Sequence, residues 1–236
     1  MRKNINNKAL RIFNLSVIIS NQFIVILINK RGVTLKPKII LQEYIEEYLK
    51  DTLENLDFKY ARSSPKFSKE KNKFKITISF SISNYSHEDT CIFWSSWGIS
   101  SKEYKKWYEN EWGQKTDNSM IIGISDWNIP GWVEKDSHVT INSDFSSKKN
   151  FNEFIDNVLK VGIPYVNQIN SWETAAELAL EQPIIFYDQV FDLYLMADKH
   201  EKAKEILEEG IEKLSYYDAF MLLPELEKRK KKYFNS

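Results

Sequence analysis

The sequence predicts an α+β fold: an antiparallel meander sheet with helices packed on one face, followed by a C-terminal helical hairpin. Apolar and polar side chains alternate strictly from Phe74 to Ile82, which is the pattern of a strand with one buried face. Residues 37–56 repeat apolar side chains at steps of three and four, as an amphipathic helix does. Short turns and one short helix join the successive predicted strands, which favours an antiparallel meander, because parallel neighbours need crossovers of a dozen or more residues.

Further strands are expected where apolar residues lie between turn-forming ones. These segments are 57–67, 90–97, 119–125 and 137–142. A capping box of Ser100 and Glu103 predicts a helix that Gly113 ends. Two more helices are expected, one that starts after Asp144 or Ser146 and stops at 162–164, and one over 172–182 that Pro183 breaks.

The last part of the chain, residues 183–236, is rich in Glu, Lys, Ala and Leu and predicts the helical hairpin. Six of its residues stand at the spacings of a tetratricopeptide-type unit, which this segment resembles: Tyr187, Val190, Tyr194, Ala203, Leu207 and Gly210. A single unit cannot bury both of its faces, so we expect it to dock on the preceding domain. The basic run 228–232 is expected to be a solvated helix end.

Residues 1–34 form an apolar extension with several open interpretations. Basic residues precede the apolar stretch 12–28, as in a membrane anchor, but polar residues such as Asn14 and Asn21 interrupt it. The extension is alternatively a non-native start, with folding information beginning near Leu35. The domain is then 35–182. A membrane contact is not the favoured interpretation, and the expected location is the cytoplasm, with membrane association through 12–28 as the alternative.

Composition narrows the classes of function. The chain of 236 residues has 33 Lys and Arg against 33 Asp and Glu, which argues against nucleic acid as the main partner, because that affinity comes largely from neutralising phosphates. The single cysteine, Cys91, excludes a disulfide scaffold and fits a reducing compartment.

No local motif predicts a catalytic centre, a metal site or a cofactor. The three histidines stand at no metal-ligand spacing, and the sequence has neither a nucleophile elbow nor a glycine-rich phosphate loop. A pair of catalytic carboxylates, however, can come from distant parts of the chain and then has no characteristic spacing in the sequence. A hydrolase with dispersed carboxylates, in a cleft lined by Trp94, Trp97 and His138, therefore stays open as the alternative function.

Tryptophan is concentrated in one segment, because six of the seven fall within residues 94–132. Trp127 and Trp132 lie on a turn-rich segment that is expected to expose both indoles. Tryptophan is also common at the centres of protein interfaces. The predicted binding residues are Trp127, Trp132, Asp126, Trp94, Trp97, Glu134 and Asp136. The acidic members of this set would suit a basic partner.

Several short motifs resemble a family of small uncharacterised bacterial α+β domains, over residues 35–182. They are the helix from Pro37, the strand 74–82, Trp97-Gly98-Ile99, Gly131-Trp132 and Gly162-Ile163-Pro164-Tyr165. Such domains occur beside polymorphic toxins as candidate immunity proteins. The resemblance implies a non-enzymatic protein-binding module that neutralises a toxin by steric blocking, and a nuclease toxin would be a basic partner of this kind. It assigns no catalytic residues, and the oligomeric state stays open.

Overall fold

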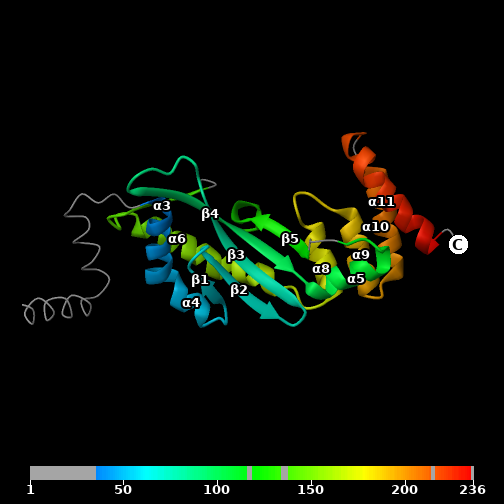
Figure 1. Cartoon of the computed structure of the whole chain (residues 1–236), viewed down its shortest axis with the longest axis horizontal. Helices are drawn as coiled ribbons and strands as arrows, with labels where there is room; N and C mark the ends of the chain where they lie inside the picture. The colour runs from blue at the N-terminus through cyan, green and yellow to red at the C-terminus, as the bar shows by residue number, and fades with distance from the viewer. Residues whose placement is uncertain (1–35, 116–118, 134–137, 214–215, 235–236) are drawn as a thin grey trace, which may run out of the picture.

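The computed structural model describes residues 36–115, 119–133, 138–213 and 216–234, with the strands toward one end of the molecule and the C-terminal helices at the other (Figure 1). In this part of the chain six strands form one sheet: β1 (Lys59–Ala61), β2 (Lys66–Lys71), β3 (Phe74–Ile82), β4 (Thr90–Ser100), β5 (Met120–Ser125) and β6 (Val139–Asn142). Neighbours follow the order β1-β2-β3-β4-β5, and every pairing is antiparallel. The predicted antiparallel meander is confirmed.

Strand β4 is the centre of the sheet because it has two partners on the side away from β3. Its first half pairs with β6, from Thr90 opposite Asn142 to Phe93 opposite Val139. Its second half, from Ser96 onward, pairs with β5. The segment that joins β5 to β6 therefore begins and ends beside the same strand.

Helices pack on one face of the sheet, as predicted. They include α3 (Pro37–Tyr44), the π-helical turn η1 (Ile45–Leu49), α4 (Lys50–Glu54) and α6 (Lys148–Asn157). Phe93 of β4 contacts Phe151 and Phe154 of α6, with ring centroids 6.0 and 5.3 Å apart. Tyr44 of α3 packs edge-on against Phe151 at 5.1 Å. These buried rings form the core, because each aromatic side chain removes a large apolar area from water.

Two predicted helix ends differ from the structure. The helix after β4, α5 (Lys102–Trp112), is capped by Ser101 and not by Ser100, because Ser100 is still paired in β4; Gly113 ends the helix with φ 65°, as predicted. The helix that begins with α6 does not stop at Pro164. A π-helical turn, η3 (Val158–Gly162), leads into α7 (Ile163–Asn167), and Pro164 lies in the first turn of α7, where its missing N–H is tolerated.

The C-terminal hairpin is present and is followed by another helix. After α8 (Trp172–Leu180) come α9 (Tyr187–Met196), α10 (His200–Lys213) and α11 (Tyr216–Phe234). Helices α9 and α10 approach closely at Gly210, where an added Cβ would lie 2.7 Å from the Cβ and Cγ of Tyr187.

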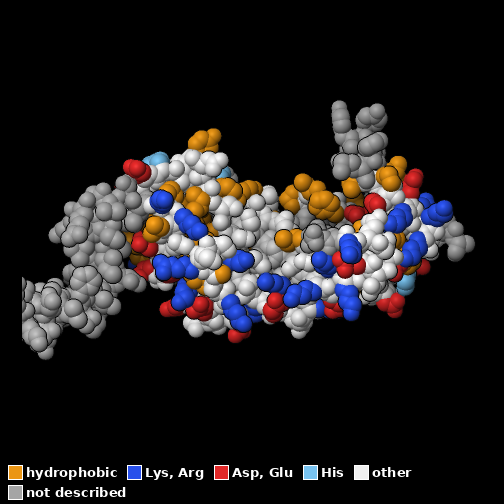
Figure 2. Space-filling model, viewed as in Figure 1, with side chains coloured by type: hydrophobic (Ala, Val, Ile, Leu, Met, Phe, Trp, Pro, Cys, Tyr) orange, Lys and Arg blue, Asp and Glu red, His pale blue; other side chains and the backbone are white. Residues whose placement is uncertain are grey.

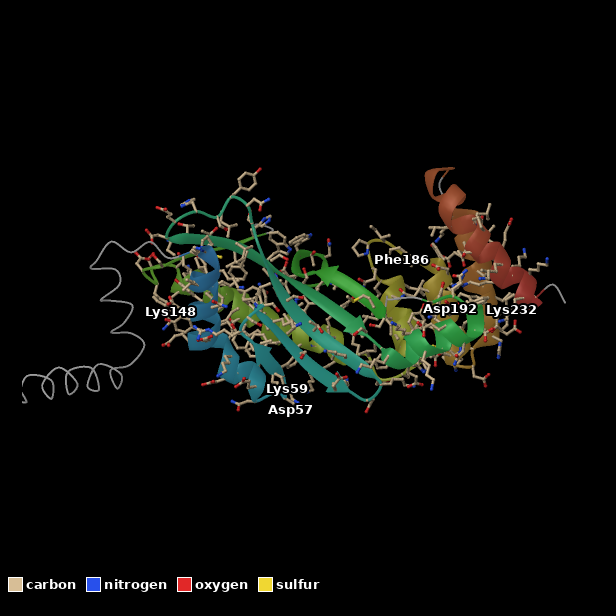
Figure 3. The ribbon with its side chains drawn as sticks, in the orientation of Figure 1. Asp57, Lys59, Lys148, Phe186, Asp192 and Lys232 are labelled. Carbon is tan, nitrogen blue, oxygen red and sulfur yellow. The ribbon has the colours of Figure 1, made fainter. Side chains whose placement is uncertain are left out.

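The basic run on α11 is not entirely solvated, and this corrects the sequence prediction. Arg229 is fully buried and donates hydrogen bonds to both carboxylate oxygens of Asp192 on α9, at 3.0 and 2.8 Å. Glu225 and Asp188 also lie within 4 Å of the guanidinium. The labels in Figure 3 place Asp192 and Lys232 at this end of the molecule. This contact was not predicted from the sequence, because Asp192 lies 37 residues away from Arg229 in the chain.

The extension of residues 1–34, with the predicted anchor 12–28 and the start near Leu35, lies outside the described residues. In the part of the chain that is described, no helix combines the length and the apolar character needed to cross a membrane.

Candidate functional site

One face of the sheet has small polar side chains and, among the residues that the structure describes, no helix packed on its centre. We call it the open face. Strand alternation and the pairing register place its members opposite the buried face. The residues of its centre are Ser68, Thr77, Ser79, Ser81, Ser96, Gly98, Gly123 and Ser125. A polar surface of this kind is suited to contact with another macromolecule.

Three ring side chains lie together at one corner of the open face, and we call them the aromatic corner: Trp94, Trp127 and His138. Trp94 extends from β4, and Trp127 lies on the 3-10 helix η2 (Asp126–Asn128). The Trp94 ring centroid is 6.1 Å from that of Trp127 and 5.1 Å from that of His138. The Trp127 side chain is 40% exposed and His138 is also exposed, so a partner can reach this corner.

A hollow of about 340 Å³ adjoins the aromatic corner. It is lined by Trp94 and His138 together with residues of the β3–β4 connection, among them Tyr85, whose side chain is 85% exposed. Tyr85 was not among the binding residues predicted from the sequence. The sequence feature that could have identified it is its position in the polar run 83–89, which joins two predicted strands. Exposed aromatic residues on such connections are frequent contact residues.

Asp126 holds this loop in place from inside the molecule. The backbone N–H and the hydroxyl of Ser95 donate to Asp126 Oδ2 at 2.6 and 2.8 Å, and the backbone N–H of Trp127 donates to Oδ1 at 2.9 Å. Ser95 lies where β4 changes partner from β6 to β5, so the carboxylate takes the place of a strand neighbour. Burial raises the pKa of Asp126, and the three hydrogen bonds oppose that shift.

The burial of Asp126 corrects its predicted role. Its side chain has no exposed surface, so it positions Trp127 and cannot contact a partner. The other acidic residues predicted for this site, Glu134 and Asp136, lie outside the described residues.

The predicted binding role of Trp97 is also corrected, because this residue belongs to the core. It is 1% exposed, and its indole N–H donates to the Ser95 hydroxyl at 3.0 Å. Its ring points to the helix-covered face, whereas Trp94, three residues earlier, points to the open face. Trp132 is half-buried and contacts Trp97 and Phe154, with ring centroids 6.2 and 5.9 Å apart. Of the two loop indoles that were predicted to be exposed, only Trp127 is.

The described residues do not assemble the cleft of the alternative hydrolase. Trp97 is absent from the hollow beside Trp94 and His138, and no Asp or Glu is among the described residues that line it. A second hollow of about 470 Å³, beside β5, has Asp188 as its acidic lining residue. Burial raises the pKa of the Cys91 thiol to about 12, which makes it a poor nucleophile. No cluster of metal-binding side chains occurs among the residues that the structure describes.

Comparisons of this chain with protein-family models, with curated proteins and with solved structures find no match.

Proposed function

We propose that this protein is a protein-binding module whose aromatic corner is the centre of the contact. The observation that carries the proposal is the pair of indoles, Trp94 and Trp127, which lie 6.1 Å apart at the edge of an open sheet face. Indoles contribute strongly to binding when a partner covers them, because each removes a large apolar area from water and also offers one N–H.

The support beneath the indoles favours a preformed site. Trp94 is on the central strand of the sheet, and Trp127 is tied by its backbone to the buried Asp126. A partner would therefore meet side chains that are already in position, which lowers the entropic cost of binding. A rigid module of this kind can act by covering the active surface of a partner. The resemblance to candidate immunity proteins extends the proposal to steric neutralisation of a toxin.

The test compares Trp94→Ala and Trp127→Ala with Phe186→Ala, an exposed aromatic that lines the other hollow. The wild-type chain is used to capture proteins from its source cells, and each captured protein is then purified and titrated against the variants by calorimetry. We expect a stoichiometric complex that either tryptophan substitution weakens by about tenfold or more, as for a central interface residue.

Phe186→Ala should leave that affinity unchanged. Equal affinity for the wild-type chain and both tryptophan variants would refute the aromatic corner as the contact. Circular dichroism of each variant checks that the fold is retained.

A further inference from the structure

Positive charge is concentrated on the strands that border the open face. Residues 59–75 contain seven Lys and Arg and one acidic residue, although the chain as a whole is neutral. The segment of α8 to α10 is the opposite, since residues 171–213 contain eleven Asp and Glu and four Lys. In Figure 2, Lys and Arg side chains gather along the lower part of the sheet, around β1, β2 and β3. The molecule therefore has a basic group of strands, β1 to β3, and an acidic group of helices, α8 to α10, which is followed by the basic run of α11.

Strand alternation divides these basic residues between the two faces of the sheet. Lys69 and Lys71 are on the helix-covered side, where they donate to the backbone carbonyls of Leu56 and Asn167. Both ammonium groups are bound to backbone carbonyls near the ends of helices, so neither lysine is available to a partner.

Three other lysines are on the open face, and we call them the lysine row: Lys59, Lys66 and Lys75. Lys59 is opposite Ser68, and Lys66 is opposite Ser79, so both share a face with the small polar centre. All three are exposed, and none makes an ion pair or a hydrogen bond with the described part of the chain. The single acid among them is Glu70, opposite Lys75. Lys102 and Lys106 are also exposed on α5, which follows β4 directly, and the exposed Glu103 lies between them in the sequence.

We propose that the open face docks an acidic surface of a partner protein, with the lysine row contacting its carboxylates. This proposal rests on the proposed function, and it adds that the contact surface of the partner is negatively charged. It replaces the expectation of a basic partner, which depended in part on Asp126. Unpaired lysines on this face attract an acidic surface at long range and raise the rate of encounter, and the aromatic corner on the same face then supplies the short-range contact.

The charge distribution favours a protein over a nucleic acid. Nucleic-acid affinity comes largely from neutralised phosphates, and this chain has equal numbers of basic and acidic residues. A protein presents its carboxylates over a limited area, which matches the limited extent of the lysine row.

The test uses the full chain and poly-L-glutamate as the acidic probe. The variant carries Lys59→Glu, Lys66→Glu and Lys75→Glu, and the matched control carries Lys149→Glu, Lys204→Glu and Lys231→Glu, which are exposed lysines away from the open face. Amide chemical shifts are followed by NMR at two salt concentrations. We expect shifts on β1, β2 and β3, weaker binding at high salt, and a loss of affinity of about tenfold or more in the variant only.

Three results would overturn the proposal. The first is equal affinity of the two triple variants for poly-L-glutamate. The second is tighter binding of oligouridylate of equal charge, which would assign the face to nucleic acid. The third is a dimer of the wild-type chain in sedimentation experiments that the triple variant abolishes, which would assign the face to a second copy. None of these results changes the outcome of the Trp94 and Trp127 titrations, so the two proposals fail separately.

Discussion

At Gly162 the missing side chain lets a helix pass directly over the Trp97 indole. An added Cβ would lie 2.4 Å from the ring atoms Cη2 and Cζ2. Trp97 cannot move away, because its ring is buried and its N–H is bound to Ser95. The π-helical turn that ends at Gly162 brings the backbone to this ring. The absence of a Cβ atom at Gly162 therefore allows the helix to pack this closely against the sheet.

Gly162→Ala is expected to lower the free energy of unfolding by about 1 to 3 kcal/mol, because it overpacks a closed part of the core. Urea denaturation followed by tryptophan fluorescence measures the change. Gly123→Ala is the matched control, since an added Cβ there meets no atom within 4 Å. Equal destabilisation by both substitutions would contradict the role of the Trp97 contact.

Local pattern could predict some of these residues and not others. The alternation at 74–82 identified a half-buried strand, because alternation follows directly from which side chains are buried. Asp126 and Ser95 are 31 residues apart, and no local pattern reports that a carboxylate will replace a strand partner. For the same reason the sequence could identify the cluster of tryptophans, but it could not separate the buried Trp97 from the accessible Trp94 and Trp127.

At the scale of the elements, α11 is held against α9 and α5 by ion pairs, one of which is fully buried. The Arg229 guanidinium and the Asp192 carboxylate are both fully buried, and the hydroxyl of Tyr104 on α5 lies 3.5 Å from the same carboxylate. Near the end of the helix, Lys232 and Tyr233 both contact Glu111 of α5. Charge pairing, together with packing on Trp112 and other apolar side chains, thus holds the last helix against α5 and α9.

Arg229→Met is expected to destabilise the protein by about 3 to 5 kcal/mol, because it leaves the Asp192 carboxylate buried without its counter-charge. Denaturation and limited trypsin digestion of α11 measure the effect. Combining Arg229→Met with Asp192→Leu should recover most of the lost stability. Lys231→Met, an exposed control, should change little. A double variant as unstable as the single one would contradict this account.

The contact at Glu111 predicts how stability depends on pH. Burial raises the pKa of Glu111, but hydrogen bonds and charge from Lys232, with the Tyr233 hydroxyl, outweigh burial and hold the pKa below its ordinary value. The folded state therefore binds this proton less readily than the unfolded state, whose carboxyl has a pKa of about 4.3. The resulting stabilisation is present above that pH and is lost as the pH falls through the lower, folded-state pKa.

Glu111→Gln removes this dependence. The difference in free energy of unfolding between the wild-type chain and the variant should be largest near neutral pH and should shrink on acidification, as urea denaturation over a pH series would measure. A difference that stays constant, or grows, as the pH falls would show that Glu111 does not stabilise the docking of α11 through its charge.

At the scale of the whole molecule, contacts cross the boundary that the sequence predicted between residues 182 and 183. Gln189 of α9 donates to the backbone carbonyl of Met120 in β5 at 2.8 Å, and Tyr104 and Trp112 of α5 are buried beneath the C-terminal helices. A change in composition can mark such a boundary in the sequence. It does not report how tightly the two parts dock, because that depends on pairs of residues far apart in the chain.

The full chain is accordingly expected to unfold in one cooperative transition. A fragment that ends at residue 182 should unfold at a lower urea concentration, because it exposes the apolar surface of α5. Circular dichroism at 222 nm and tryptophan fluorescence should report the same midpoint for the full chain. Two separated transitions would instead indicate that the sheet and the C-terminal helices are stable independently.

The double pairing of β4 has a consequence for how this surface could diversify. Since β5 and β6 are both hydrogen-bonded to one strand, the backbone at each end of their connecting segment is fixed in register. Insertions or replacements between those two fixed points that keep the buried Asp126 and the half-buried Trp132 would alter what the segment presents without disturbing the strands that carry it. Sequences that keep β4 and its two neighbours could thus acquire new recognition properties through this one connection.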